Sequence, residues 1–415
     1  MSALALREST KLDRWRVGAL GAAVVYRLGT VGASFVVAVH AGPTAFAPVA
    51  LLLILNPFGS MVASFGSDQA LFRTVAAQKH PLNLELMSAL KVCAMPALLA
   101  LPIAFAFAFI ASFFSYSCAL FSVAGLCAAL EAYSVLIVAG YYRAVTDVRR
   151  YIAVLVSVTI AGTATRLVLM LVVGIDPLTS WILGDVAIVL VSLPLLLRWL
   201  ASLRDKSPVY KLGYRKTVAF GGPMTLHGCF QWLLGSSDRF VIGAVLGSAA
   251  LGTYGAVYQF SGIYNAAASE INKTGLHRYA EGKAGINSAL AITRDQRSLL
   301  LIWVLGLAPE MIALYVLQNA GYSGAVTLGM TLYLSFVPLV IYLPLANELS
   351  VTHGAGVTMS VASGIGALLN IAVNVALVWF VGLYSGAIAN VVGYTGMALV
   401  LLLRKRALTN AGGAQ

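Results

Sequence analysis

The chain has 415 residues, of which 60% are hydrophobic and only 10% are charged. A soluble protein of this length carries about a quarter charged residues, so a globular protein with a water-exposed surface is excluded. We therefore expect an integral membrane protein. The net charge of +12 needs its own explanation, because strongly basic proteins often bind nucleic acid.

Long apolar runs predict membrane-spanning helices. Backbone polar groups in lipid must be satisfied within the spanning structure, which leaves helices or closed barrels. The runs reach about 20 residues, the length that a spanning helix needs, and the alternating pattern of barrel strands is absent. We predict an all-α polytopic membrane protein with about 12 transmembrane helices. The predicted spans are 17–39, 44–67, 90–112, 117–141, 151–174, 179–201, 218–245, 249–270, 298–318, 324–347, 356–381 and 384–403.

The basic residues are distributed as membrane orientation requires. Of the 27 lysines and arginines, 24 lie at the two ends of the chain, or in or next to the loops on the same side of the membrane as those ends. The other three, Arg27, Arg166 and Arg239, lie inside spans. Since lysine and arginine concentrate on the cytoplasmic side, both termini are predicted to be cytoplasmic. The positive charge is thus an orientation signal that also attracts membrane lipids, and no nucleic-acid partner is expected.

A basic stretch divides the chain into two halves of six spans each. "RWLASLRDKSPVYKLGYRKT" is the longest internal polar segment. We predict an N-terminal six-helix bundle over 1–203, a cytoplasmic linker over 204–217 and a C-terminal six-helix bundle over 218–415. The second span of each half ends similarly, in "ASFGSDQALFR" and "AAASEINKTGLHR", which suggests two parallel repeats related by an axis along the membrane normal.

The sequence contains no motif of a familiar enzyme class. Patterns of the type G-x-x-x-x-G-K-[ST], H-E-x-x-H, G-x-S-x-G and C-x-x-C are absent. The four cysteines lack metal-ligand spacing. We expect no enzyme activity, no metal and no cofactor. A membrane polysaccharide ligase or polymerase stays as an alternative, although such enzymes commonly resemble one another in a sizeable outer loop, and every outer loop predicted here is short.

Seven acidic and arginine residues lie deep inside the predicted spans. A charge at the bilayer centre costs several kcal/mol, so such residues face a bundle interior or a wet cavity. Counted from the span ends at about 1.5 Å per residue, they are Arg27, Glu131 and Glu310 near mid-membrane, and Arg166, Asp185, Asp238 and Arg239 in the outer half. We predict that the three arginines line a cleft between the two halves and bind substrate. The four acids are predicted to act in ion coupling, at a gate, or as partners of the arginines.

Polar and aromatic side chains repeat along one face of span 249–270. Tyr254, Tyr258 and Asn265 follow the helical period, and we predict that they line the same cleft. Helix–helix hydrogen bonding, worth about 0.6 kcal/mol each, is the alternative, and we favour it for Asn370 and Asn374 of span 356–381.

Prolines interrupt two spans of the second half. Pro338 and Pro344 fall within span 324–347, and Pro309 precedes Glu310. Broken helices allow the bending that alternating-access transport requires. A static kink explains the same prolines equally well.

Asp238 and Arg239 are neighbours in "WLLGSSDRFVIGAVLG". Adjacent helical residues point about 100° apart, so the two side chains do not simply neutralise each other. Each needs a partner from elsewhere. Since Arg166 and Asp185 lie at a similar depth, we predict a charge network that holds an outer gate; direct contact of Arg239 with substrate is the alternative.

Two segments resemble the polysaccharide and O-antigen flippases. In "GGPMTLHGCFQWLLGSSDRFVIGAVLGSAALGTYGAVYQF" an early proline and a tryptophan are followed by an Asp-Arg pair and an "LG-x-Y-x-x-A" pattern. The segment "LLNIAVNVALVWFVGLYSGAIANVVGYTGMALVLLLRKR" is similar to the family's penultimate helical hairpin. The first-half segment "GTVGASFVVAVHAGPTAFAPVALLLILNPFGSMVASFGSDQALFR" is a looser match.

The resemblance implies a member of the multidrug/oligosaccharidyl-lipid/polysaccharide exporter superfamily, with two six-helix bundles around a central cleft. It implies a flippase of the bacterial inner membrane that moves undecaprenyl-pyrophosphate-linked oligosaccharides to the outer leaflet for surface polysaccharide assembly. Its implied partners are a polysaccharide polymerase and glycosyltransferases. Two other transporters stay open: a cation-coupled drug or small-molecule antiporter of the same superfamily, and a major-facilitator transporter, whose loop motif "GSDQALFRTVAAQK" matches only in part.

Overall fold

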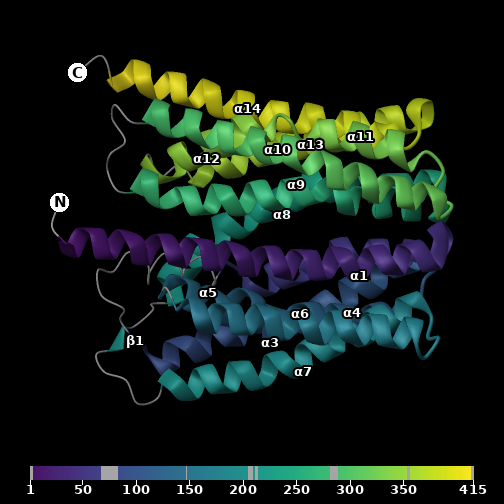
Figure 1. Cartoon of the computed structure of the whole chain (residues 1–415), viewed down its shortest axis with the longest axis horizontal. Helices are drawn as coiled ribbons and strands as arrows, with labels where there is room; N and C mark the ends of the chain where they lie inside the picture. Colours follow the sequence, from purple (N-terminus) through teal and green to yellow (C-terminus); the bar gives the residue numbers. More distant parts are fainter. Residues whose placement is uncertain are drawn as a thin grey trace. The chain divides into compact units, whose positions relative to one another are not determined.

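A computed structural model of the chain describes residues 3–66, 83–145, 147–203, 209–210, 214–280, 288–352 and 356–412. These residues are almost entirely helical (Figure 1). The chain folds into two compact units, one formed by Met1–Val37 with Leu52–Thr225 and the other by Ala38–Leu51 with Leu226–Gln415. Ala38–Leu51 therefore belongs to the second unit although it lies early in the chain. The domain boundaries 1–203, 204–217 and 218–415 stay a prediction.

The first unit consists mainly of helices. α1 (Ala3–Ser64) is broken at Gly42 and contributes Ala38–Leu51 to the second unit. The others are α3 (Leu86–Phe113), α4 (Cys118–Ala132), the π-helix η1 (Tyr133–Val138), α5 (Ala139–Ala144), α6 (Val148–Leu171) and α7 (Pro177–Leu203). Two-residue strands β1 (Asn83–Leu84) and β2 (Val209–Tyr210) pair in parallel and connect the loops after α1 and α7.

The second unit contains seven helices in the part of the chain that the structure describes. They are α8 (Tyr214–Leu246), whose first turns belong to the first unit, α9 (Ser248–Ala280), α10 (Ser288–Asn319), α11 (Ala325–Ser335), α12 (Leu339–Thr352), α13 (Gly356–Val381) and α14 (Tyr384–Gly412). The predicted break in span 324–347 is confirmed, because α11 ends at Ser335 and α12 begins after Pro338. Pro344, by contrast, lies inside α12.

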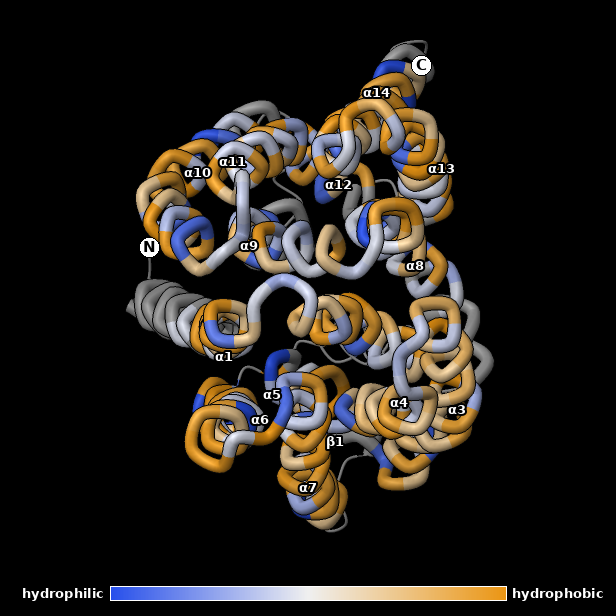
Figure 2. Tube along the Cα trace, turned by 90° about the vertical axis from the view of Figure 1, so that its right-hand side faces the viewer, coloured by the Kyte–Doolittle hydropathy of each residue, from blue (hydrophilic) through white to orange (hydrophobic). Residues whose placement is uncertain are grey.

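The helices confirm a multi-pass membrane protein. Nine of the described helical stretches are long and apolar enough to cross a membrane, and apolar residues predominate along them (Figure 2). One stretch, Val24–Ser64, has 41 residues and contains the break at Gly42. α8 and α9 are not among the nine, and they carry Asp238, Arg239 and the polar face of Tyr254 and Tyr258.

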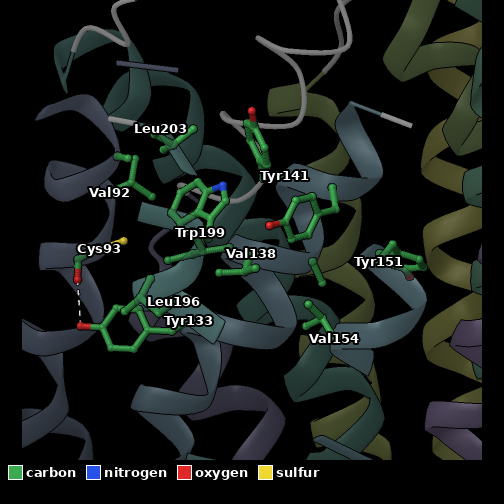
Figure 3. Close-up of a cluster of buried hydrophobic side chains, with 14 of the residues drawn as sticks. Val92, Cys93, Tyr133, Val138, Tyr141, Tyr151, Val154, Leu196, Trp199 and Leu203 are labelled. Carbon is green, nitrogen blue, oxygen red and sulfur yellow. Dashed lines mark hydrogen bonds between the residues drawn. The ribbon is translucent and has the colours of Figure 1, made fainter. Parts of the chain in front are cut away.

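The core of the first unit gathers aromatic side chains from η1, α5 and α7 (Figure 3). The Trp199 ring lies 5.4 Å from that of Tyr141. The Tyr133 hydroxyl donates a hydrogen bond of 2.9 Å to the carbonyl of Cys93 on α3. A tyrosine hydroxyl buried with an apolar ring needs such a partner, so this contact fixes η1 against α3.

Small residues of α9 allow Ala38–Leu51 to pack closely against it. A Cβ at Gly252 would overlap the carbonyl oxygen of Pro43, and a Cβ at Gly255 would overlap the Ala50 side chain. Small residues of this kind let membrane helices approach each other. The Tyr322 hydroxyl donates to the Ala38 carbonyl at 2.8 Å, so a carbonyl next to the break in α1 finds a donor within the second unit.

Candidate functional site

The buried intramembrane charges form separate clusters within the two units. Arg166 and Asp185 lie in the first unit, and Asp238, Arg239 and Glu310 lie in the second. All five are among the most buried polar residues of the described chain. Because an uncompensated charge is costly in this environment, the partners of each side chain indicate what it does.

In the first unit Arg166 and Asp185 form an ion pair between α6 and α7. The Arg166 guanidinium bonds one carboxylate oxygen of Asp185, and the Asn56 amide of α1 donates to the other oxygen at 2.7 Å. The guanidinium also lies over the Trp181 ring, 4.2 Å from its centroid. Both carboxylate oxygens are thus bonded, and the pair joins three helices.

Glycine next to the acid makes room for this pair. A Cβ at Gly184 would overlap the side chain of Arg166, and a Cβ at Gly162 would lie 2.7 Å from Ile188. The arginine therefore lies flat across α7, directly beside Asp185. Arg166 is an unsuitable anion receptor in this arrangement, because a substrate phosphate would have to displace the carboxylate of Asp185.

Glu131 and Arg27 are the other two predicted site residues of the first unit. Glu131 accepts a hydrogen bond of 3.1 Å from the Tyr26 hydroxyl, so it has a partner on α1. Arg27 lies within α1, but its side chain lies outside the described residues. Its predicted role as a substrate cation stays a prediction.

In the second unit Asp238 is bonded to groups other than an arginine side chain. The Tyr254 hydroxyl of α9 donates to one carboxylate oxygen at 2.5 Å, and the backbone N–H of Arg239 donates to the other at 2.8 Å. A Cβ at Gly386 of α14 would overlap the Tyr254 hydroxyl. Glycine at this position therefore permits the close approach of α14 to the Asp238–Tyr254 pair.

Arg239 is held by an aromatic face instead of a carboxylate. Its guanidinium lies 3.8 Å from the centroid of the Tyr258 ring. Its guanidinium makes a long contact of 3.5 Å with the Gly235 carbonyl, and its buried Nε has no hydrogen-bond partner among the described residues. An arginine has five N–H donors, and at least the Nε–H of Arg239 is unused.

Aromatic and amide side chains continue from Arg239 along the second unit. Tyr258 packs against Phe336, at 5.8 Å between ring centroids, and Phe336 lies 6.1 Å from Tyr394. Asn265 donates to the Tyr394 hydroxyl at 3.5 Å. The structure thus places the predicted residues Tyr258 and Asn265 near each other. Phe336 and Tyr394 were not predicted; Pro338, two positions after Phe336, is the sequence signal from which Phe336 could have been found.

Each partner found for Arg166, Asp185 and Asp238 comes from the same unit as the charge itself. Of the partners expected for Asp238, which were another span, a helix end or the ligand, the structure shows another span, through Tyr254 of α9. The network that would link all four charges at an outer gate stays a prediction.

Asparagines of α13 hold helices of the second unit together. Asn370 accepts from Ser237 at 3.0 Å and donates to Asn390 at 3.0 Å. Asn374 accepts from Ser385 at 2.7 Å. These bonds confirm the prediction of helix–helix hydrogen bonding for the asparagine pair.

Among the residues that the structure describes, no cluster of three or more His, Cys, Asp or Glu side chains could hold a metal ion. The four cysteines, all of them described, are free thiols.

Comparisons with known proteins agree with this fold. A multidrug resistance MATE family transporter of the MOP superfamily, in an outward-facing conformation, is 15% identical, with a TM-score of 0.69 over 97% of this chain and 96% of that one. A MATE structure in complex with MaD5 gives 15% and 0.68 over 98% and 97%. A MOP superfamily transporter from Pyrococcus furiosus, whose title reports a binding pocket of reversed polarity, gives 16% and 0.61 over 97% and 96%.

The sequence comparisons identify the family. A search of curated proteins gives no match. A family model described as "Polysaccharide biosynthesis protein" matches residues 41–274, which is more than half of the chain and includes both Asp238 and Arg239. The resemblance inferred from the sequence is thereby confirmed, and the chain belongs to this family of polysaccharide biosynthesis proteins.

Proposed function

We propose that the protein flips undecaprenyl-pyrophosphate-linked oligosaccharides across the bacterial inner membrane by alternating access. Twelve crossings in two six-helix bundles, with both termini in the cytoplasm, are part of this proposal. It is supported by membership of the polysaccharide biosynthesis family and by the MOP superfamily fold. A polysaccharide polymerase and glycosyltransferases are the partners that such a reaction requires, since they consume and supply the substrate.

The observation that carries the proposal is the state of Arg239. Hydrocarbon is a barrier to the anionic pyrophosphate, so a flippase must offer cationic donors within the membrane. Guanidinium forks bind phosphate oxygens through paired, charge-assisted hydrogen bonds. Arg239 is buried, it forms no ion pair with any described carboxylate, and its Nε is unbonded. Among the described intramembrane arginines, Arg239 is the one with an unused N–H donor.

The aromatic residues beside Arg239 suit the rest of the substrate. Tyr258, Phe336 and Tyr394 follow one another at ring distances of about 6 Å. Flat apolar faces with a hydroxyl at the edge pack against the apolar faces of sugar rings and bond their hydroxyls. Arg27 enters the proposal as a second cation, whereas Arg166 holds α1, α6 and α7 together through Asp185.

The test replaces Arg239 in a host that encodes this protein and displays a surface polysaccharide. Arg239→Ala should reduce polysaccharide display about 10-fold to 100-fold, the equivalent of a lost charge-assisted hydrogen bond of about 1.5–3 kcal/mol. Protein level should stay normal, because Asp238 keeps its bonds to Tyr254 and to the backbone. Arg239→Lys should restore display only in part, since an ammonium lacks the planar fork.

The matched control is Arg294→Ala, which removes an exposed arginine from α10 and should leave display unchanged. Arg27→Ala in the same assay tests the second cation. Full display in Arg239→Ala, at normal protein level, would contradict the assignment of Arg239 as the cation that binds the substrate. Full display in a strain that lacks the protein would reject the flippase itself.

A cation-coupled drug or small-molecule antiporter is the second candidate. The structural likeness to MATE transporters favours it, and Asp238, Asp185, Glu131 and Glu310 would be its candidate coupling acids. Expression in a drug-sensitive host should then raise resistance to organic cations, and the loss of an acid should abolish it. A cationic drug would be repelled by Arg239, so Arg239→Ala should increase resistance under this alternative, whereas it lowers display under the first.

A further inference from the structure

Glu310 is a buried acid that the proposed substrate site does not use. It lies on α10 directly after Pro309, and only 4% of its surface is exposed. Its carboxyl group receives one hydrogen bond, of 2.7 Å, from the Ser261 hydroxyl of α9. No lysine, arginine or histidine among the described residues bonds to it.

Among the described residues, the helices packed against α10 offer no compensating charge near Glu310. Those helices are α9, α11 and α12. Their described ionisable side chains are Tyr254, Tyr258 and Tyr264 on α9, Tyr333 on α11, and Tyr342 and Glu348 on α12. Glu348 is already paired with Lys405 at 2.7 Å. The further charges of α9 begin at Glu270, nine positions beyond Ser261 and about 14 Å along the helix axis.

The surroundings of Ser261 decide which form of Glu310 fits. Besides the carboxyl group, the Ser261 oxygen lies 3.2 Å from the Gly329 carbonyl of α11 and 3.5 Å from the Val257 carbonyl. The hydroxyl has one hydrogen and faces three acceptors. An ionised Glu310 would receive that single hydrogen for about four lone-pair positions, and a buried carboxylate with one donor and no cation is strongly disfavoured.

A protonated Glu310 gives each hydrogen-bond donor in this set an acceptor. The carboxylic O–H donates to the Ser261 oxygen, and the Ser261 O–H then donates to the Gly329 carbonyl. The oxygen–oxygen distance of 2.7 Å is that of a direct O–H···O bond. A single proton between the two oxygens fits this distance.

Close packing of α10 against α11 brings the Gly329 carbonyl near the Ser261–Glu310 hydrogen bond. Tyr333 and Trp303 bond reciprocally, the Tyr333 hydroxyl donating to the Trp303 carbonyl at 2.5 Å and the indole N–H donating to the Tyr333 carbonyl at 3.3 Å. A Cβ at Gly329 would overlap Leu314 of α10. Glycine at this position lets the helices approach, and its carbonyl comes within reach of Ser261.

We propose that Glu310 is a proton-binding site, and that its bound proton joins α10 to α9 and α11 through Ser261 and Gly329. The site lies apart from the Arg239 cation and needs no substrate. If the protein transports by alternating access, as proposed above, this proton also couples the packing of α10 to pH. That consequence rests on the proposed function, whereas the protonation itself does not.

The test is infrared difference spectroscopy on the purified full-length protein in lipid nanodiscs at pH 7. Wild type minus Glu310→Gln should contain the C=O stretch of one protonated carboxylic acid per chain. Ser261→Ala should keep this band and shift it, because the acid loses its hydrogen-bond acceptor. The matched control is Glu348→Gln, whose difference spectrum should show ionised carboxylate bands, since Glu348 is paired with Lys405.

Carboxylate bands in place of the acid band, in wild type minus Glu310→Gln, would overturn the proposal. An acid band that Ser261→Ala leaves unshifted would overturn the bonding to Ser261. Neither readout depends on transport, so a failure here is distinguishable from a failure of the flippase proposal. If the acid band is present but a strain that lacks the protein displays polysaccharide normally, only the proposed function is rejected.

Discussion

In the first unit Arg166 and Asp185 bond to each other, whereas in the second unit Asp238 and Arg239 bond to different groups. Both sets consist of one arginine and one aspartate, and both are buried. The difference arises from their spacing. Arg166 and Asp185 lie on two helices joined by a tight turn, so their side chains meet face to face. Asp238 and Arg239 are neighbours on one helix and point apart.

A buried charge keeps unused hydrogen-bond donors when its obvious partner is bonded elsewhere. Asp185 has both oxygens bonded, and Arg166 is committed to it. Asp238 instead takes the Tyr254 hydroxyl, which leaves Arg239 on the face of Tyr258 with an unbonded Nε. The first cluster therefore holds helices together, and the second retains donors.

Removing the buried arginine should lower the stability of the protein much more in the first unit than in the second. Arg166→Met leaves Asp185 buried with one amide donor, which should lower the free energy of unfolding by about 3–5 kcal/mol. Arg239→Met removes a cation–π contact and a weak hydrogen bond, a loss of about 0.5–2 kcal/mol. Thermal unfolding of both variants in the same detergent measures the difference.

The double variant Arg166→Met/Asp185→Leu sharpens this test. Replacing both partners of a buried ion pair by apolar residues is often neutral, so the double variant should recover most of the lost stability. Equal stability of the two single variants would contradict the division into a structural pair and a free cation.

Adding a methyl group beside the ion pair should have an intermediate effect. A Cβ at Gly184 would overlap Arg166, so Gly184→Ala should displace the guanidinium and cost about 1–3 kcal/mol. Gly140→Ala is the control, because the space around Gly140 is open. The expectation fails if the two alanine variants unfold at the same temperature.

Loss of the Tyr254 hydroxyl should have the smallest of these effects on stability. Tyr254→Phe removes one donor from Asp238, which keeps the Arg239 backbone N–H, so we expect a loss of about 1 kcal/mol. Tyr315→Phe, at a residue with 62% of its surface exposed, serves as the control and should unfold like wild type. If Asp238 then formed an ion pair with Arg239, polysaccharide display would fall as well. Unchanged display together with unchanged stability would show that the Tyr254 hydroxyl is not a partner of Asp238.

The sequence by itself determined the class of protein and the family. Apolar runs of spanning length, scarce charge and the break at Pro338 follow from local composition, and the helices confirm them. The Asp-Arg pair and the glycine-rich segment after it carried the family resemblance, which the family match at 41–274 confirms. Such features can be read locally because a membrane helix satisfies its own backbone.

Only the tertiary structure decided which charges are partnered. Asn56 and Asp185 meet across 129 positions, and Ser261 and Glu310 across 49. Helical periodicity shows which face of a helix is polar, but it does not show which other helix packs against that face. The segment Ala38–Leu51 joined the second unit for the same reason, since its contact with Gly252 and Gly255 depends on the close approach of two helices far apart in sequence.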